Sequence, residues 1–129
     1  MKHKRTAEEK AYLDWLAQWP CLVCLKRLCD QSHQSIIGLS AEARAVTVPW
    51  SEAQCGRVEI HHAGLHGLGQ KSNDLETIPL GAKHHQHGPE AAHVVGKRWF
   101  ADVLKMERAE AFATLHELYV RETGGIIGT

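Results

Sequence analysis

The stretch "VEIHHAGLHGLGQKSNDLETIPLGAKHH", which runs from Val58 to His85, decides the fold because it carries a His-His pair near each end. The pairs are His61-His62 and His84-His85. The chain has ten histidines, and seven of them lie between His61 and His93. Imidazole is both a common metal ligand and a proton acceptor near neutral pH, so this concentration points to one of those two kinds of chemistry.

The local pattern around the pairs predicts two strands followed by a helix. Residues 57–62 alternate and are partly β-branched, and residues 75–80 read as a second strand in which Pro79 marks an edge or an end. The glycine-rich residues 63–74 between them predict a loop, and residues 81–88 a short helix. This order brings both His pairs together. Because neighbouring strand residues face opposite ways, one of His61 and His62 can face a cation and the other a reacting water.

Helices are expected on both sides of this segment. Thr6 and Glu9 form a capping-box pattern, the apolar positions Tyr12 to Trp19 recur at helical spacing, and Pro20 ends the helix. Residues 97–129 read as further helices that end at Gly124-Gly125. Residues 34–54 read as an irregular insertion with a short helix at 41–45. The predicted fold class is therefore a single small α+β domain.

The bulk composition narrows the class of protein. A chain of 129 residues that is 43% hydrophobic and 23% charged fits one globular domain. The sequence has no apolar run near the roughly 20 residues that cross a bilayer, and its charged N-terminus lacks the apolar core of a secretion signal, so we expect a cytoplasmic protein without a membrane partner. The formal net charge of zero argues mildly against tight non-specific binding of nucleic acid.

Four cysteines, Cys21, Cys24, Cys29 and Cys55, give a second signal. In a reducing compartment a Cys-x-x-Cys pair such as Cys21-Cys24 is more typical of a metal clasp or a redox motif than of a disulfide. The two cysteines have the spacing of a zinc knuckle. No βαβ pattern accompanies the pair, which disfavours the redox reading.

As a set, these motifs resemble the HNH endonucleases, which have a ββα-metal (His-Me finger) fold, and among them most of all the phage-type RecA-dependent nucleases. The resemblance covers residues 20–24 ("PCLVC") and about 58–100. It implies an N-terminal helix over residues 1–20, a zinc knuckle with an insertion over 21–57, a ββα-metal core over 58–96 and C-terminal helices over 97–129. The insertion and the last helix have no counterpart in it.

The resemblance also implies roles for the histidines. His62 would be the general base, and His61, His85 and His93 would bind a catalytic divalent cation, Mg²⁺ or Mn²⁺. Asp74, or its neighbour Asn73, would hold His62 in its productive orientation. His87 is expected to be exposed, although it can also approach a phosphate group of the DNA substrate that the resemblance implies.

Relatives of this kind clasp a structural zinc ion with two Cys-x-x-Cys-like pairs. This chain offers Cys21, Cys24 and His84, but Gly81 stands where the third cysteine is expected. A structural zinc site needs four ligands. Cys55 is the first candidate for the missing one, followed by Cys29 and His33.

The resulting expectation is a metal-dependent endonuclease that hydrolyses DNA, encoded by a phage and acting with RecA-coated DNA. Lys71, Lys97 and Arg98 flank the expected site and either grip phosphates or form a solvated surface. Trp50, in the insertion, either packs under its loop or stacks on a base. The alternative is a zinc domain that binds DNA or protein without cutting it. The sequence leaves the role of the insertion open.

Overall fold

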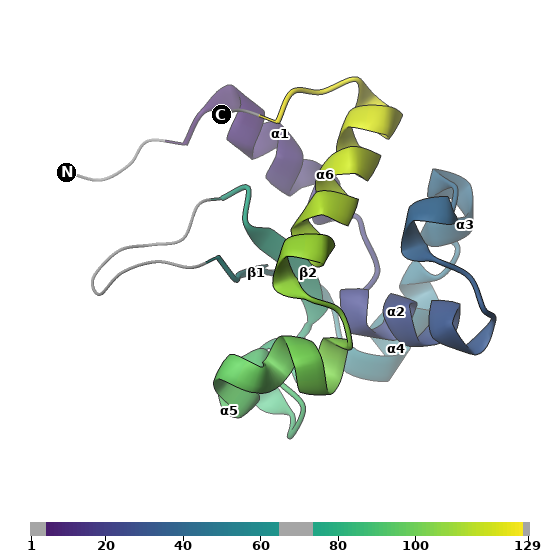
Figure 1. Ribbon diagram of the computed structural model, residues 1–129, viewed down its shortest axis with the longest axis vertical. Coiled ribbons are helices and arrows are strands. Elements are labelled where there is room, and N and C mark those ends of the chain that lie inside the picture. The colour runs from purple at the N-terminus through teal and green to yellow at the C-terminus, as the bar shows by residue number, and fades with distance from the viewer. Residues whose placement is uncertain (1–4, 65–73, 128–129) are drawn as a thin grey trace.

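The computed structural model describes residues 5–64 and 74–127, in which the chain is a small mixed protein of helices and one two-stranded sheet (Figure 1). Before the sheet lie α1 (Ala7–Leu16), α2 (Leu22–Gln31), η1 (Ile36–Gly38), α3 (Ala41–Ala45) and α4 (Val48–Cys55). The sheet consists of β1 (Val58–His62) and β2 (Thr77–Gly81). After it come the π-helix η2 (Lys83–His87), α5 (Ala92–Val95), η3 (Gly96–Arg98), the π-helix η4 (Phe100–Leu104) and α6 (Arg108–Thr123).

The two strands form an antiparallel hairpin that sets the direction of the first His pair. His61 lies opposite Ile78, and His62 lies opposite Thr77. Both predicted strands are present, although β2 begins at Thr77, two residues later than expected. Pro79 lies inside β2, and because each strand of a two-stranded sheet is an edge, its missing N–H is tolerated there. The hairpin therefore fixes which histidine faces which side.

Residues of α1, α2 and α6 form the core together with β2, and Figure 1 shows α6 lying across the sheet. The predicted capping box at the start of α1 is confirmed, because the Thr6 hydroxyl accepts from the Glu9 amide at 3.0 Å and the Glu9 carboxylate accepts from the Thr6 amide at 2.8 Å. Tyr12 packs edge-on against Tyr119, which joins the two ends of the chain. As predicted, α6 ends at Gly124, whose φ of 70° is readily adopted by glycine.

The chain before the sheet is more helical than the sequence predicted. Cys21 is the N-cap residue of α2, and Cys24 lies in the first turn of that helix. This segment is helical because it buries an apolar stripe that includes Leu22, Leu25 and Cys29. The insertion is also largely helical, since Ser40 caps α3 and a proline starts α4. The short helix predicted at 41–45 is the only part of the insertion that the sequence placed correctly.

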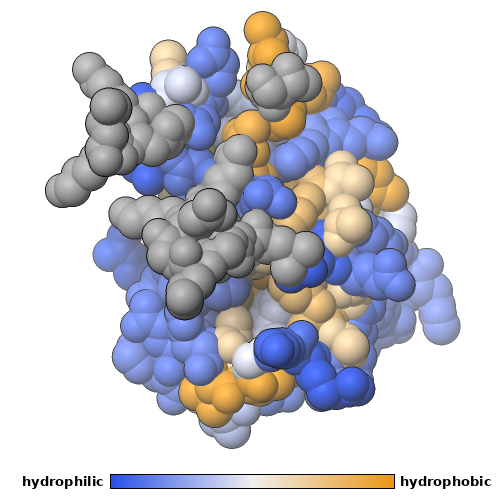
Figure 2. All heavy atoms as spheres, turned by 60° about the vertical axis from the view of Figure 1, so that its left-hand side comes forward, coloured by the Kyte–Doolittle hydropathy of each residue, from blue (hydrophilic) through white to orange (hydrophobic). Residues whose placement is uncertain are grey.

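The described surface is mixed in character. Its exposed large apolar side chains are dispersed over several elements: Leu28, Val46, Trp50, Val94, Val120 and Ile126. Figure 2 shows one face, on which hydrophilic residues flank a broken band of apolar ones. Within the described residues, no helix is both long and apolar enough to span a membrane.

Candidate metal centres

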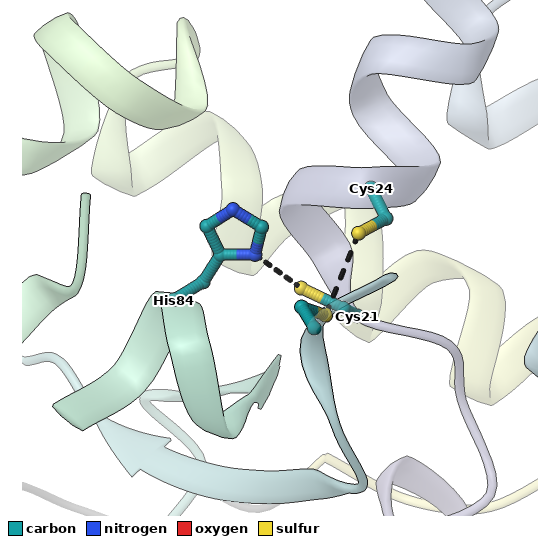
Figure 3. Close-up of side chains that lie close together, drawn as sticks. Cys21, Cys24 and His84 are labelled. Atoms are coloured by element: carbon teal, nitrogen blue, oxygen red, sulfur yellow. Dashed lines mark hydrogen bonds between the residues drawn. The ribbon is translucent and has the colours of Figure 1, made fainter. Parts of the chain in front are cut away.

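Four buried side chains from three elements form the first cluster, which we call the Cys3His cluster: Cys21, Cys24, Cys55 and His84. One possible ligand atom from each lies within 4.8 Å of the others. Cys24 Sγ is 3.5 Å from Cys55 Sγ, and Cys21 Sγ is 3.4 Å from His84 Nδ1. In Figure 3, Cys21, Cys24 and His84 point toward one another. All four cysteines of the chain are free, so no disulfide competes for these sulfurs.

These distances fit a tetrahedral ion. With bonds of about 2.3 Å to sulfur and about 2.1 Å to nitrogen, ligand atoms around zinc lie about 3.5–3.8 Å apart. Three thiols and one imidazole are also a donor set that zinc favours in structural sites. The Cys3His cluster can therefore bind a metal such as zinc.

Local backbone features hold the cluster in place. The buried hydroxyl of Ser51 accepts from the Cys21 amide at 2.8 Å, which ties the start of α2 to α4. Cys55 is the last residue of α4, and Gly56 turns the chain into β1 with a φ of 93°. Cys21 is thus positioned at the start of α2 and Cys55 at the end of α4, while His84 lies on η2, the π-helix after β2.

Gly81 explains how Cys55 joins the cluster. A Cβ atom at position 81 would lie well under 3.0 Å from Cys55 Sγ, and 2.9 Å from the Cys55 carbonyl oxygen. The sulfur of Cys55 therefore occupies the space that a side chain at position 81 would need. Of the candidates for the missing ligand, the structure brings in Cys55 alone. Cys29 is buried outside the cluster, and His33 is exposed.

Side chains of the Cys3His cluster shift the pKa values of one another. Hydrogen bonds from Cys24 and Cys55 lower the pKa of the Cys21 thiol far below its usual range. Hydrogen bonds with Cys21 and Cys55 raise the pKa of His84 to about 9. A thiolate at Cys21 next to a protonated His84 is the consequence, and a thiolate is the form in which cysteine binds metal.

The second cluster, which we call the histidine trio, consists of His61, His85 and His93. The Nε2 atoms of His85 and His93 are 3.0 Å apart, and the His61 ring centroid is 4.9 Å from that of His85. Two nitrogens bound to one ion at about 2.1 Å lie about 3.0–3.4 Å apart, so the spacing of His85 and His93 fits a shared ion. Burial, followed by repulsion from His85 and His93, lowers the pKa of His61 to about 4, which keeps its imidazole neutral.

Glu59 orients the trio, and the sequence analysis missed it. Its Oε1 atom is 2.8 Å from His85 Nδ1. A carboxylate only accepts hydrogen bonds, so His85 carries its proton on Nδ1 and leaves Nε2 free for an ion. Glu59 precedes His61 by two residues on β1, and this spacing places both on one face of the strand. This two-residue spacing was the signal from which the sequence could have placed Glu59 near the trio.

His62 faces away from the trio and toward Asp74. Its Nε2 atom is 2.7 Å from Asp74 Oδ1, while Arg5 Nε donates to Asp74 Oδ2 at 2.6 Å. The hydrogen bond from Arg5 lowers the pKa of Asp74; burial opposes this, and the bond to His62 adds to it. Asp74 is therefore ionised and accepts from His62 Nε2–H, which leaves Nδ1 of His62 as the basic nitrogen.

The other described residues that the sequence placed at the site lie outside both metal clusters. Lys97 is exposed on η3, and Arg98 is exposed and pairs with Asp102 at 3.3 Å. His87 is exposed on η2 and belongs to neither cluster. Lys71 and Asn73 lie outside the described residues, so Asp74 alone of the two candidates can be placed beside His62. Arg5 was not singled out from the sequence, because nothing local links it to a residue 69 positions away.

The fold and the two clusters together define a small α+β protein with two separate sets of metal-ligating side chains. Comparison with known proteins finds no matching family model, no matching curated protein and no matching solved structure. The geometry of the two clusters is therefore what supports a function.

Proposed function

We propose that this chain is a metal-dependent endonuclease that hydrolyses DNA phosphodiester bonds on a ββα-metal core. One observation supports the proposal most directly: two neighbouring residues of β1 face different partners, one suited to metal binding and the other to accepting a proton. His61 belongs to the histidine trio, whereas the basic nitrogen of His62 is set by Asp74. The order of β1, β2 and the π-helix η2 supports the same core.

The donor set of the trio suggests the kind of ion. Three imidazole nitrogens suit divalent transition metals such as Zn²⁺, Co²⁺ or Ni²⁺ better than Mg²⁺, which prefers oxygen ligands. Three protein ligands leave coordination positions open for substrate, as catalytic sites require. A cation there would stabilise the negative charge that develops on the phosphate and the leaving oxygen.

His62 acts as the general base in this proposal. Its Nδ1 atom takes a proton from water as the water oxygen forms a bond to phosphorus, and the bond from phosphorus to the 3′ oxygen breaks. The leaving oxygen takes its proton from solvent. Asp74 holds the His62 ring and stabilises the imidazolium that forms, and Arg5 holds Asp74. Glu59 fixes the tautomer of His85.

The Cys3His cluster serves as the structural metal site. It joins α2, α4 and η2, so a metal bound there would hold together the helices around the hairpin. This cluster is also the observation that favours the alternative function, a zinc domain that binds DNA or protein without cutting. Action on a RecA-coated strand and a phage origin follow from the sequence resemblance alone and stay predictions.

The test compares native protein with His62→Ala on supercoiled plasmid, each loaded with zinc at the Cys3His cluster and supplied with Co²⁺, Ni²⁺, Mn²⁺ or Mg²⁺. We expect native protein to nick the plasmid and His62→Ala to nick it about 10²- to 10⁴-fold more slowly, with unchanged metal binding at the trio. His33→Asn, which alters an exposed histidine outside both clusters, is the matched control. Native protein that binds DNA but nicks it with none of these ions would support the alternative.

A further inference from the structure

A cavity of about 370 Å³ opens beside the Cys3His cluster and has no role in the proposed hydrolysis. Its walls come from α2, α4, η2 and the turn at residues 88–90. Besides cluster residues, its lining includes one aromatic ring, charged side chains and amides: Trp50, Arg27, Lys83, Glu90, Gln31 and Gln54. The volume falls within the range of roughly 300–1,000 Å³ that is usual for small-ligand sites.

Trp50 differs from the other three tryptophans. Trp15, Trp19 and Trp99 each contact another aromatic ring. Within the described residues Trp50 has no such ring contact, and 41% of its surface is exposed. Of the two readings of Trp50 that the sequence allowed, packing under the loop is therefore the weaker. An exposed indole at a cavity offers a flat face on which a planar ligand can stack.

Outside the Cys3His cluster, Lys83 carries the one positive charge without an ion-pair partner among the described side chains that line the cavity. Arg27 is neutralised by Glu90, with Nη2 and Oε2 2.9 Å apart. Lys83 is exposed, and across residues 5–64 and 74–127 no carboxylate lies within ion-pair distance of it. The amides of Gln31 and Gln54 supply donors and acceptors but no charge. A ligand that fits this lining has a planar ring, polar edges and one negative group.

We propose that this cavity binds one unpaired nucleotide of a DNA strand, with its base stacked on Trp50 and its phosphate on Lys83. The inference rests on the proposed function for the choice of DNA as the ligand. Lys83 and His85 belong to the same π-helix, η2. The enzyme would prefer substrates with an unpaired segment.

The experiment measures binding of a fluorescent 15-nucleotide oligo-dT by anisotropy, with all proteins zinc-loaded and carrying His62→Ala so that the probe stays intact. We expect Trp50→Ala to weaken binding about 10- to 100-fold, since one stacked base contributes roughly 1–3 kcal/mol. Trp50→Phe keeps a stacking ring and should stay within about threefold. Val46→Ala removes a 77% exposed side chain outside the cavity lining and is the matched control.

Two further measurements test whether duplex DNA or an acidic peptide, and not a single strand, binds in the cavity. A blunt 15-base-pair duplex should bind Trp50→Ala and its parent equally, and a 15-residue polyglutamate should not compete with the oligo-dT. Unchanged affinity of a folded Trp50→Ala for oligo-dT overturns the inference, and so does competition by the peptide. Because binding is measured without cleavage, this result is independent of the nicking assay that decides the proposed function.

Discussion

Replacing Gly81 with alanine is expected to expel Cys55 from the Cys3His cluster. The added Cβ atom would lie well under 3.0 Å from Cys55 Sγ, whereas carbon and sulfur atoms in contact lie roughly 3.5–4.0 Å apart. The carbonyl oxygens of Cys55 and Gly56, at 2.9 and 3.0 Å, leave the new methyl group no space on the other side. The sulfur must move because the backbone around it cannot.

The expected loss of zinc affinity follows from the contribution of one ligand to the binding free energy. Zinc binding by a structural site of four ligands has a free energy of about 10–16 kcal/mol, so one ligand contributes about a quarter of it, roughly 2.5–4 kcal/mol. Since 1.4 kcal/mol corresponds to a factor of ten, zinc affinity should fall about 10²- to 10³-fold. Competition with a chromophoric chelator measures this loss directly.

Two variants sharpen the test. Gly38→Ala is the control, because a Cβ at position 38 would meet only the flexible Ser35 hydroxyl, at 3.3 Å. Cys55→Ala removes the same sulfur without adding a Cβ atom at position 81, so it should lower zinc affinity by a similar factor. Native zinc affinity in Gly81→Ala would refute the placement of Cys55.

The remaining predictions concern the histidine trio. Glu59→Gln should weaken cation binding at the trio about 10- to 100-fold and leave metal binding at the Cys3His cluster unchanged, because the amide no longer orients His85 as a carboxylate does. Isothermal titration of zinc-loaded protein with Co²⁺ or Ni²⁺ measures the affinity of the trio. Equal cation affinity of Glu59→Gln and native protein would contradict the role of Glu59. The pKa of His61 is lowered from 6.5 to about 4, so the unfolded chain binds more protons than the folded one between these pH values. The free energy of unfolding of metal-free protein should therefore fall as pH is lowered from about 6.5 to 4, and denaturant titrations should show a smaller fall in His61→Gln; an identical fall in both would refute this assignment.

Much of the fold was predictable because its signals are local. The capping box at Thr6, the alternation in residues 57–62 and the glycine after α6 each depend on neighbours a few positions away. The insertion was misread because its helices are short and its apolar periodicity is weak. Two signals for helix starts were nevertheless present in the sequence: Ser40, which caps α3, and Pro49, in the first turn of α4.

By itself, the sequence determined which residue types stand beside the hairpin: two His pairs, a Cys-x-x-Cys pair and an acidic residue ahead of the second strand. The resemblance assigned them to two sites, and only the tertiary structure brings the ligand atoms of each set close together. Cys55 replaces a ligand at Gly81 because its sulfur fills the space of a missing side chain, and Arg5 reaches Asp74 across 69 positions. His84 and His85 separate into different clusters because one turn of π-helix directs adjacent side chains toward different neighbours. Such pairings depend on packing between distant segments, and no local pattern encodes them.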